Sequence, residues 1–315
     1  MDTGNKIILS VLVPVYNWDS SLLLDKLAEE IHDGNFNDMV ELVVIDDCSM
    51  DDMAKAANGK KVLECRSAGV NIKYSELQKN IGRALTRNML ANQASGEFFL
   101  FLDSDVLPDR ADFLGKYIDH IAKNEWDVIC GGLSCLYRKM TDRKYDFYFY
   151  WNTKIVAKIA EVRNKTPWRY LWTSNVLVRK SVFLEVPFDE RFSGYGYEDA
   201  EWGIRLSKKY KVLHIDNTVS HLGLVTKEAA YQKMRDSIKN YVLLAKLHPD
   251  AFKESSVYRV SRRLIFLPVS LLDLMDVVLE KMFSFISNNI ICFLIFQMNT
   301  AVLFAKQFKK NWSTY

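Results

Sequence analysis

The sequence predicts an α/β protein with a mostly parallel sheet, and two features of the chain indicate this fold. Apolar stretches at residues 7–15, 41–45 and 98–102 have the length and composition of buried strands. Helical patterns separate these stretches, so strand and helix alternate along the N-terminal third of the chain. We therefore expect a Rossmann-like sheet flanked by helices.

The elements follow one another with recognisable local signals. The strand at 7–15 leads to a helix with apolar residues at 23, 24, 27 and 31, and the strand at 41–45 is followed by a polar turn. A short strand at 70–74 and a helix at 80–93, which places Arg83 and Arg87 one turn apart, precede the strand at 98–102. Further strands are expected at 126–136, 172–179 and 211–215, an aromatic-rich helix at 146–161, and another helix from 198.

Polar side chains stand at the end of each of the first buried strands. Tyr16-Asn17, Asp46-Asp47 and Asp103-Ser104-Asp105 all fall at carboxyl ends, which is the edge where open α/β sheets bind ligands. Asp103 and Asp105 are two positions apart, so an extended chain points both to one side. A hard divalent cation such as Mg²⁺ or Mn²⁺ would relieve their repulsion. The alternative is a helix cap, but Asp109 already occupies a capping position after Pro108.

A second acidic segment begins near residue 194. Two glycines bracket Tyr195, and Glu198, Asp199 and Glu201 follow at the start of a helix. Carboxylates are favoured there by the helix dipole, which explains one or two of them but not the glycine and aromatic residues that precede them. Downstream, His214 lies in a strand and is expected to be structural, whereas His221 is expected in a loop, available as a ligand.

Composition limits the class of protein. The chain has 315 residues, 49% hydrophobic and 26% charged, enough for one large domain and an appendage. A net charge of +3 is too small to indicate a nucleic-acid partner. The five cysteines are odd in number and lack CxxC spacing, which favours reduced thiols in the cytoplasm. The apolar residues 7–15 are too short and interrupted for a signal peptide.

The composition changes after about Asp250, which predicts a catalytic domain at 1–250 and an apolar helical extension at 251–315. Residues 283–305 carry no charge, although several amides dilute the stretch. Basic residues flank the apolar part: Arg259, Arg262, Arg263, Lys306, Lys309 and Lys310. We expect helices that lie on an anionic membrane surface. The alternative is helices that pack on the catalytic domain or form a homodimer.

Five segments in this order resemble one protein family. They are VPVYN (13–17), VIDDCSMDD (44–52), QKNIGRALTRN (78–88), FLFLDSD (99–105) and GYGYEDAEWGIRL (194–206). Together they resemble family 2 glycosyltransferases with the GT-A fold, over residues 7–225. The last segment also resembles β-1,4-galactosyltransferases and bacterial chondroitin-type polymerases. Two positions depart from these relatives, which have glycine where this chain has Cys48 and Tyr197.

The resemblance implies a role for each matching residue. The nucleotide-sugar site would contain Pro14 and Tyr16 at the base, Asp47 at the uracil ring nitrogen, Arg87 at the diphosphate and Asp103 at the ribose. Ser104 would also belong to this site, and Ser174 and Asn175 would lie near the donor sugar. Asp105 and His221, with Asp103, would form the metal site. Asp199 would be the catalytic base and Glu198 would hold sugar or acceptor hydroxyls.

These observations lead to one expected function and two alternatives. The expected function is an inverting, Mn²⁺- or Mg²⁺-dependent transferase that moves a sugar from a UDP-sugar to a glycan or lipid-linked acceptor by single displacement, in bacterial polysaccharide synthesis on the cytoplasmic face of the membrane. A nucleotidyltransferase would require a glycine-rich phosphate loop after the first strand, where this chain has Tyr16-Asn17-Trp18-Asp19. A non-catalytic, membrane-associated binding module ranks last, because each expected site position holds a competent residue.

Overall fold

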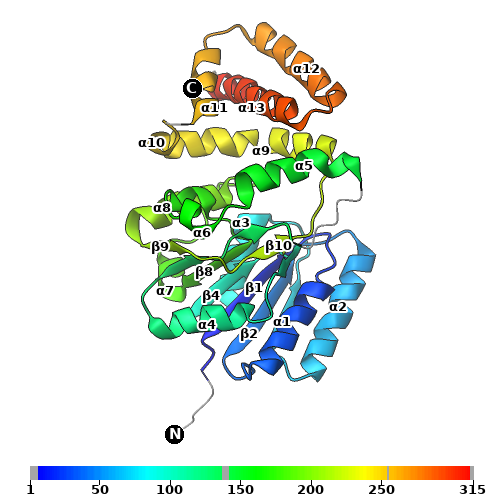
Figure 1. Ribbon diagram of the computed structural model, residues 1–315, viewed down its shortest axis with the longest axis vertical. Helices are drawn as coiled ribbons and strands as arrows, with labels where there is room; N and C mark the ends of the chain where they lie inside the picture. Colours follow the sequence, from blue (N-terminus) through cyan, green and yellow to red (C-terminus); the bar gives the residue numbers. More distant parts are fainter. Residues whose placement is uncertain (1–5, 137–141, 254, 313–315) are drawn as a thin grey trace.

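A seven-stranded sheet forms the centre of the protein (Figure 1). The computed structural model describes residues 6–136, 142–253 and 255–312. The strands lie in the order β3 (Ile72–Glu76), β2 (Val40–Asp46), β1 (Leu9–Val15), β4 (Phe98–Leu102), β8 (Asn175–Arg179), β6 (Val128–Cys130) and β9 (Val212–His214). All pairings are parallel except those of β8, which is antiparallel to both β4 and β6. The expected α/β fold with a mostly parallel sheet is confirmed.

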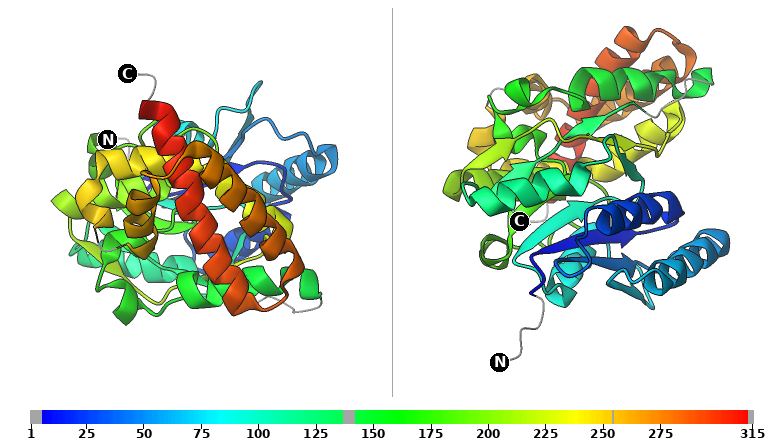
Figure 2. Two further views of the ribbon diagram at one scale, coloured as in Figure 1. Left: turned by 90° about the horizontal axis from the view of Figure 1, so that it is seen from above. Right: turned by 60° about the horizontal axis from the view of Figure 1, so that its bottom comes forward.

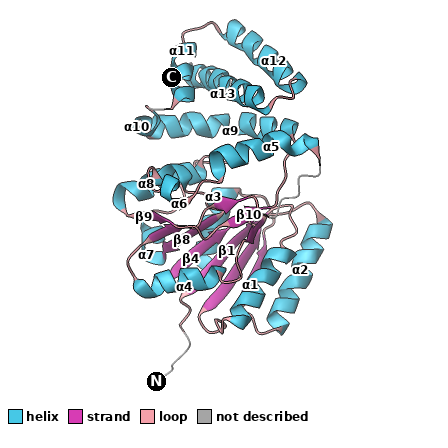
Figure 3. Cartoon of the chain, in the orientation of Figure 1, coloured by secondary structure: helices cyan, strands magenta, loops and turns pink. Residues whose placement is uncertain are grey.

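Helices cover both faces of this sheet and give three layers (Figure 3). The helices on one face are α1 (Ser21–Asp33), α2 (Asp52–Ser67) and α4 (Phe113–Lys123). Those on the other are α3 (Arg83–Gln93), α7 (Lys180–Glu185) and α8 (Glu198–Lys209). In β4, Phe98, Leu100 and Leu102 face the first layer and Phe99 and Phe101 face the second. Burial on both faces explains why this strand is uninterruptedly apolar.

A second, smaller sheet lies beyond the end of β4. It contains β5 (Val106–Pro108), β10 (Val219–His221) and β7 (Leu133–Ser134). Two expectations were therefore wrong: residues 126–136 form two short strands in different sheets, and His221 ends a strand instead of lying in a loop. Asp109 does not cap a helix, because its carboxylate accepts hydrogen bonds from Thr218 and Ser220 on the β10 side. Strand pairing thus places His221 beside the turn that carries Asp105.

The segment between β7 and β8 is more irregular than its sequence predicts. The aromatic helix expected at 146–161 divides into α5 (Asp146–Trp151), a π-helical turn (Asn152–Val156) and α6 (Ala160–Arg163). Two 3₁₀ turns, Arg143–Tyr145 and Pro167–Tyr170, stand on either side of these helices. Arg163 is buried there and donates hydrogen bonds to the Cys130, Gly131 and Ile215 carbonyls and contacts His214. The expected structural role of His214 is consistent with this position.

The long helix α9 (Lys227–Leu247) lies between the layers around the large sheet and the C-terminal helices (Figure 1). After it come α10 (Pro249–Phe252), α11 (Ser256–Leu264), α12 (Val269–Phe285) and α13 (Asn289–Trp312). One apolar cluster joins α9 to α5, α12 and α13, and a second joins α9 to α8 and α13. Both clusters cross the boundary expected at residue 250, so the extension and the catalytic part share buried surface.

The outer surface of the extension remains apolar. Phe266 and Phe285 are 84% and 86% exposed, and Leu274 is 60% exposed. The other apolar side chains there that are at least 40% exposed are Val269, Leu271, Val277, Val278, Met282, Ile290, Ile291, Leu294 and Met298. Figure 2 shows α12 and α13 running side by side on one end of the molecule. Residues 289–310 are long and apolar enough to cross a membrane, but half of the most apolar window is buried in the protein.

Candidate active site

The loops after β1 and β2 are bound to each other at the carboxyl edge of the sheet. Asn17 Oδ1 accepts hydrogen bonds from the Met50 and Asp51 backbone amides, and the Asn17 backbone amide donates to Ser49 Oγ. Asn17 and Cys48 both have positive φ, at 49° and 61°. Tyr16, beside this junction, is 49% exposed, while Pro14 is half-buried within β1. The expected base-binding residues therefore lie at an open edge whose backbone is fixed.

Asp47 connects this edge to the start of α3. Its carboxylate accepts hydrogen bonds from the Ile81 amide at 2.7 Å and the Gly82 amide at 2.9 Å. Gly82 has φ of 87°, a conformation that glycine adopts without strain. A carboxylate has about four acceptor positions, so these two bonds leave capacity for another donor. Asp47 thus orients the loop that begins α3 and keeps acceptor positions that these two bonds do not use.

Arg87 is buried between two carboxylates that come from different parts of the chain. Its guanidinium lies 2.8 Å from Asp103 Oδ1 and 3.1 Å from Glu198 Oε1, and only 1% of its surface is exposed. Ser174 Oγ donates a further bond of 2.6 Å to Asp103. Burial alone would raise the pKa of Asp103, but the Arg87 and Arg83 guanidiniums and the Ser174 hydroxyl lower it. Asp103 is therefore a carboxylate anion held within an ion-pair network.

Arg83 lies one helical turn before Arg87 and is much more accessible. Its side chain is 47% exposed, 3.8 Å from Glu198, and its guanidinium stacks over the Tyr195 ring at 4.8 Å. An exposed guanidinium at the rim of the site can reach a diphosphate, which a buried one cannot do without moving. Arg83 is the residue that sequence reasoning left out of the site, although its spacing of four from Arg87 was visible.

Asp105 and His221 form the second polar pair of the site. Asp105 Oδ2 lies 3.1 Å from His221 Nε2, and the Leu222 amide donates to the Asp105 carbonyl at 2.7 Å. The pairing of β5 with β10 places His221 opposite Val106. Gly223 lies against this pair, and a Cβ on it would approach Asp105 Oδ2 to 2.5 Å. Any side chain at this position would occupy the space beside the two possible ligands.

The donor set suits a divalent cation that a substrate helps to bind. One carboxylate and one imidazole converge, but Asp103 is engaged by Arg87 and Ser174. Among the described residues, no group of three or more His, Cys, Asp or Glu side chains could hold a metal ion. Mg²⁺ and Mn²⁺ are commonly bound by one or two protein ligands together with substrate phosphates and water. Asp105 and His221, with the gap at Gly223, fit this kind of site.

The acidic helix start is the third part of the site. Gly194, Gly196 and Tyr197 all have positive φ, and α8 begins directly after them at Glu198. Glu198 is 4% exposed and bound to Arg87, whereas Asp199 is only half-buried. Burial and the neighbouring Glu198 charge raise the pKa of Asp199 to about 7. A carboxyl group with that pKa can take a proton near neutral pH.

Helix α9 fixes the loop that precedes Asp199. The Asn240 side-chain amide donates to three carbonyls of this loop, those of Ser193, Tyr195 and Gly196. Tyr197 stacks on Tyr241 with ring centroids 4.9 Å apart. A non-glycine residue with φ of 71° is strained, and this stacking contributes to holding it there. The position of Asp199 therefore depends on α9 as well as on its own helix.

Not every expected site residue lies in this arrangement. Asn175 is 1% exposed, and its side chain bonds to Tyr117 and to the Gly132 and Asn217 carbonyls. Asn175 therefore joins the start of β8 to the segments around Gly132 and Asn217. Ser104 is half-buried in the turn after β4. Glu201, also acidic and early in α8, pairs with Arg205 and His248, away from Arg87.

Comparison with known proteins gives a consistent picture. Validoxylamine A glucosyltransferase of Streptomyces hygroscopicus subsp. limoneus is 28% identical over 65% of this chain and 49% of its own length. Poly(ribitol-phosphate) beta-N-acetylglucosaminyltransferase TarS of Staphylococcus aureus is 35% identical over 34% of this chain and 19% of its own. The chain thus spans half of one relative and a fifth of the other.

Solved structures show the same fold. The mannosyltransferase PcManGT from Pyrobaculum calidifontis, in complex with GDP-Man and Mn²⁺, superimposes with a TM-score of 0.59 at 18% identity, over 98% of this chain and 88% of that one. S. aureus TarS superimposes with a TM-score of 0.53 at 23% identity, over 79% of this chain and 44% of that one. The family model "Glycosyl transferase family 2" matches residues 10–186, more than half of the chain. The chain belongs to glycosyltransferase family 2 and has the GT-A fold.

Proposed function

We propose that this protein is an inverting glycosyltransferase that moves a sugar from a UDP-sugar to a hydroxyl of a glycan or lipid-linked acceptor in bacterial polysaccharide synthesis. The observation that carries this proposal is the convergence of three polar groups at one sheet edge. They are the Asp105–His221 pair, the Arg83 and Arg87 guanidiniums, and the Glu198–Asp199 carboxylates. They supply a cation site, counter-charge for a diphosphate and a base.

The donor is expected at the edge formed by β1, β2 and β4. Tyr16 offers an exposed ring for a nucleobase, and Asp47 retains acceptor positions for an imino group such as that of uracil. Arg83 lies where it can contact the diphosphate. When the carbon–oxygen bond to the diphosphate breaks, negative charge accumulates on the leaving oxygen, and fixed guanidinium groups stabilise that charge.

Asp199 is proposed as the general base. Its raised pKa of about 7 makes it a stronger proton acceptor than an ordinary aspartate. It removes the proton of the acceptor hydroxyl while the acceptor oxygen forms a bond to the anomeric carbon and the diphosphate leaves from the opposite face. One displacement inverts the anomeric configuration. Glu198 is fixed beside Asp199 by Arg87, and its electrostatic effect is the second cause of the raised pKa of Asp199, after burial.

Mn²⁺ or Mg²⁺ would be held by Asp105 and His221, near Asp103. When bound, such an ion supplies Lewis-acid stabilisation of the diphosphate. Gly223 keeps the space beside the two ligands free of a side chain. The protein residues orient the site: β5 and β10 fix the two ligands, and Arg87 holds Asp103 in place.

The protein is further proposed to act at the cytoplasmic face of a membrane, as a peripheral protein. The support is the set of exposed apolar side chains on α12, on α13 and in the turn before α12, which include Phe266 in that turn and Phe285 on α12. A membrane location would bring a lipid-linked acceptor to the site. A homodimer that covers the same helices is the second candidate, because the same exposed area would serve either contact.

Product analysis tests the proposed reaction. The protein is incubated with UDP-sugars and, in parallel, with GDP-mannose, with and without Mn²⁺, and release of free nucleoside diphosphate is measured. We expect metal-stimulated UDP release from at least one UDP-sugar. Release of pyrophosphate from a nucleoside triphosphate and a sugar phosphate would instead indicate a nucleotidyltransferase. Absence of both nucleotide binding and turnover with every donor would contradict the proposal.

A further inference from the structure

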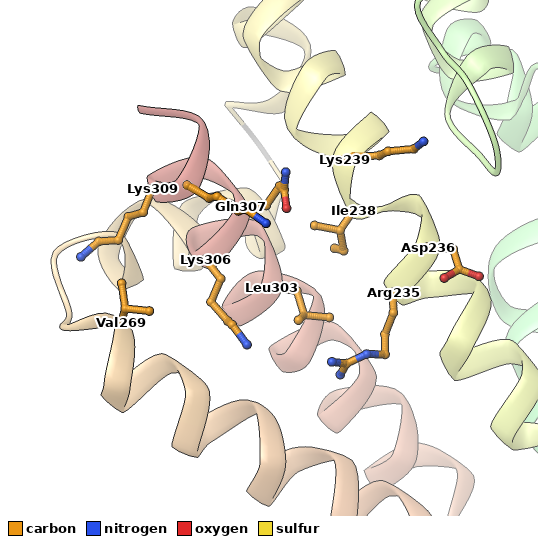
Figure 4. A pocket seen from close by; sticks show the side chains of 10 residues that line it. Arg235, Asp236, Ile238, Lys239, Val269, Leu303, Lys306, Gln307 and Lys309 are labelled. Carbon is orange, nitrogen blue, oxygen red and sulfur yellow. The ribbon is translucent and has the colours of Figure 1, made fainter. Parts of the chain in front are cut away.

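A basic pocket lies between α9, α12 and α13, outside the site described above (Figure 4). It has a volume of about 800 Å³, and five of its ten lining residues are basic. Arg235 and Lys239 come from α9, and Lys306, Lys309 and Lys310 come from α13. One lining residue, Asp236, is acidic, and it lies on the opposite side of the pocket from Lys309 (Figure 4). A pocket of this charge favours an anion.

Part of this positive charge is already compensated. Asp276 is 4% exposed and binds both Arg235 at 2.6 Å and Lys306 at 2.8 Å, so two cations share this one buried carboxylate. Asp273 lies 2.9 Å from Lys306 and Glu280 lies 3.6 Å from Arg235, so these half-exposed carboxylates compensate a further part of the charge. Lys239 donates to the neutral Ser193 hydroxyl, so its charge is not cancelled by that bond.

The pocket opens beside the apolar surface of the extension. Val269 belongs to the pocket lining and is 50% exposed at the first residue of α12. Leu271, Leu274, Val277 and Val278 continue along the same helix, and each is at least 41% exposed. A ligand with a charged head in the pocket could therefore lay an apolar chain on α12. Neither the basic pocket nor the apolar surface of α12 indicates such a ligand alone, but the two meet at Val269 and together they do.

We propose that this pocket binds the phosphate or diphosphate head of a ligand whose hydrocarbon chain lies along α12. The inference rests on the proposed function, and narrows the acceptor to one carried on a lipid phosphate. Ammonium groups and a guanidinium bind phosphate oxygens through charge-assisted hydrogen bonds. The chain contributes binding through burial of apolar area.

The pocket is joined to the acidic helix start through α9. Lys239 lines the pocket and also donates to Ser193 Oγ at 3.3 Å. The next residue, Asn240, holds the loop from Ser193 to Gly196 that precedes Glu198 and Asp199. Neighbouring residues of α9 thus contribute to the pocket and hold the loop that precedes Asp199.

Binding of soluble ligands to the full-length protein tests the proposal. Farnesyl diphosphate, below its micelle concentration, is titrated calorimetrically in the presence of saturating UDP and Mn²⁺, which occupy the nucleotide site. Farnesol and inorganic pyrophosphate are the comparison ligands. We expect farnesyl diphosphate to bind at least ten-fold more tightly than either, because only it presents both head and chain.

Two charge-reversal variants distinguish binding in the pocket from nonspecific attraction of an anion to exposed basic residues. Lys309→Glu/Lys310→Glu alters the pocket, and Arg262→Glu/Arg263→Glu makes the same charge change on the exposed surface of α11. We expect the first to weaken farnesyl diphosphate binding ten-fold or more and the second to change it less than two-fold, with unchanged UDP affinity in both. If the charge reversal lowers the melting temperature, the neutral variant Lys309→Gln/Lys310→Gln replaces it in the same binding measurement.

Binding to phosphatidylglycerol vesicles tests whether the pocket also accepts the phosphate of a phospholipid head group. Selective loss of phosphatidylglycerol vesicle binding in the pocket variant, alongside loss of farnesyl diphosphate binding, supports the site and extends it to phospholipid heads. Equal loss in both variants, or no binding of farnesyl diphosphate by the wild type, overturns it. Failure to bind UDP would instead count against the proposed function and leave the pocket result interpretable.

Discussion

Arg87 Nη1 lies 3.1 Å from Glu198 Oε1, although 111 positions separate the two residues in the chain. The pair joins α3 to the first turn of α8 through the interior of the protein. Because Arg87 also binds Asp103, it connects the end of β4 to both helices. Arg87 is thus a structural centre of the site, and the diphosphate contact that the resemblance implies for it stays a prediction.

Replacing the two arginines is expected to separate these roles. Arg87→Gln removes the buried cation that binds both Asp103 and Glu198, so we expect a loss of roughly 3–5 kcal/mol in the free energy of unfolding. Arg83→Gln removes an exposed guanidinium and should leave stability within about 1 kcal/mol while UDP affinity falls. Urea denaturation and calorimetry measure the two quantities. Equal effects of both variants on stability would contradict the assignment.

Asp105→Ala is expected to remove the Mn²⁺-dependent part of UDP binding. The variant loses one of the two ligands that converge on the proposed cation site, so the diphosphate lacks its main counter-charge. Calorimetric titration of UDP with and without Mn²⁺ measures the effect. Asp119→Ala, on the exposed side of α4, is the matched control. If metal still strengthens UDP binding in the Asp105 variant, the metal site lies elsewhere.

Asp199→Asn should retain donor binding and lower turnover by about a hundredfold or more, the usual scale for loss of a general base. The substitution is nearly isosteric and keeps a side-chain oxygen that can accept the Ala200 amide bond. Turnover and UDP affinity are measured on the same preparation. Near-normal turnover would leave Asp199 as a helix-start carboxylate and make Glu198 the next candidate base.

The pH dependence of the reaction should report the raised pKa of Asp199. The base must be deprotonated to act, so kcat/KM should rise about tenfold per pH unit below pH 7 and level off above it, given a pKa of about 7. This ascending limb should disappear in the residual activity of Asp199→Asn. A wild-type profile that is flat between pH 5.5 and 8 would contradict the role, with those limits set roughly one unit or more either side of the pKa.

The same raised pKa predicts that the fold is more stable at low pH, whereas the reaction is faster at high pH. The folded protein holds this proton up to about pH 7, whereas the unfolded chain releases it near 3.8. The stabilisation by protonation is complete below 3.8 and is lost as the pH rises through 7. Asp199→Asn should therefore raise the melting temperature more at pH 8 than at pH 5. A larger gain at pH 5 would show that burial does not raise this pKa.

Phe266→Ser/Phe285→Ser should reduce sedimentation with anionic vesicles and leave the melting temperature nearly unchanged. Both rings are more than four-fifths exposed, so the folded protein loses few internal contacts. The control, Leu22→Ser/Leu63→Ser, removes exposed apolar side chains from α1 and α2. If vesicle binding is unchanged but an oligomer dissociates, the apolar helices form a subunit interface.

The sequence was sufficient for the elements whose signals are local. Residues 98–102 are apolar because both faces of β4 are buried, and this made the strand and its acidic end predictable. Cys48 and Tyr197, the two departures from the relatives' glycines, both have positive φ. That backbone conformation explains why the relatives have glycine at these positions. In this chain, the strained Tyr197 stacks on Tyr241.

What the sequence could not supply depends on contacts between distant segments. The burial of Arg87 follows from its two carboxylate partners, and no local pattern distinguishes it from the exposed Arg83. Asp109 looked like a cap because the hydroxyls of Thr218 and Ser220 that bind it are more than a hundred residues away. Asn175 follows Ser174 in the chain but points into the strand junction, because successive residues of a strand alternate sides.

The small sheet of β5, β10 and β7 has a consequence for the entropy of ligand binding. Asp105 precedes β5 and His221 ends β10, and antiparallel pairing joins these strands. Two ligands on mobile loops would have to be immobilised each time an ion arrived, at about 0.5–1.5 kcal/mol for each side chain. Here the backbone ordering is completed during folding, so the ligand pair is preorganised. Weakening the Asp109 bonds to Thr218 and Ser220 should therefore reduce ion affinity without altering either ligand.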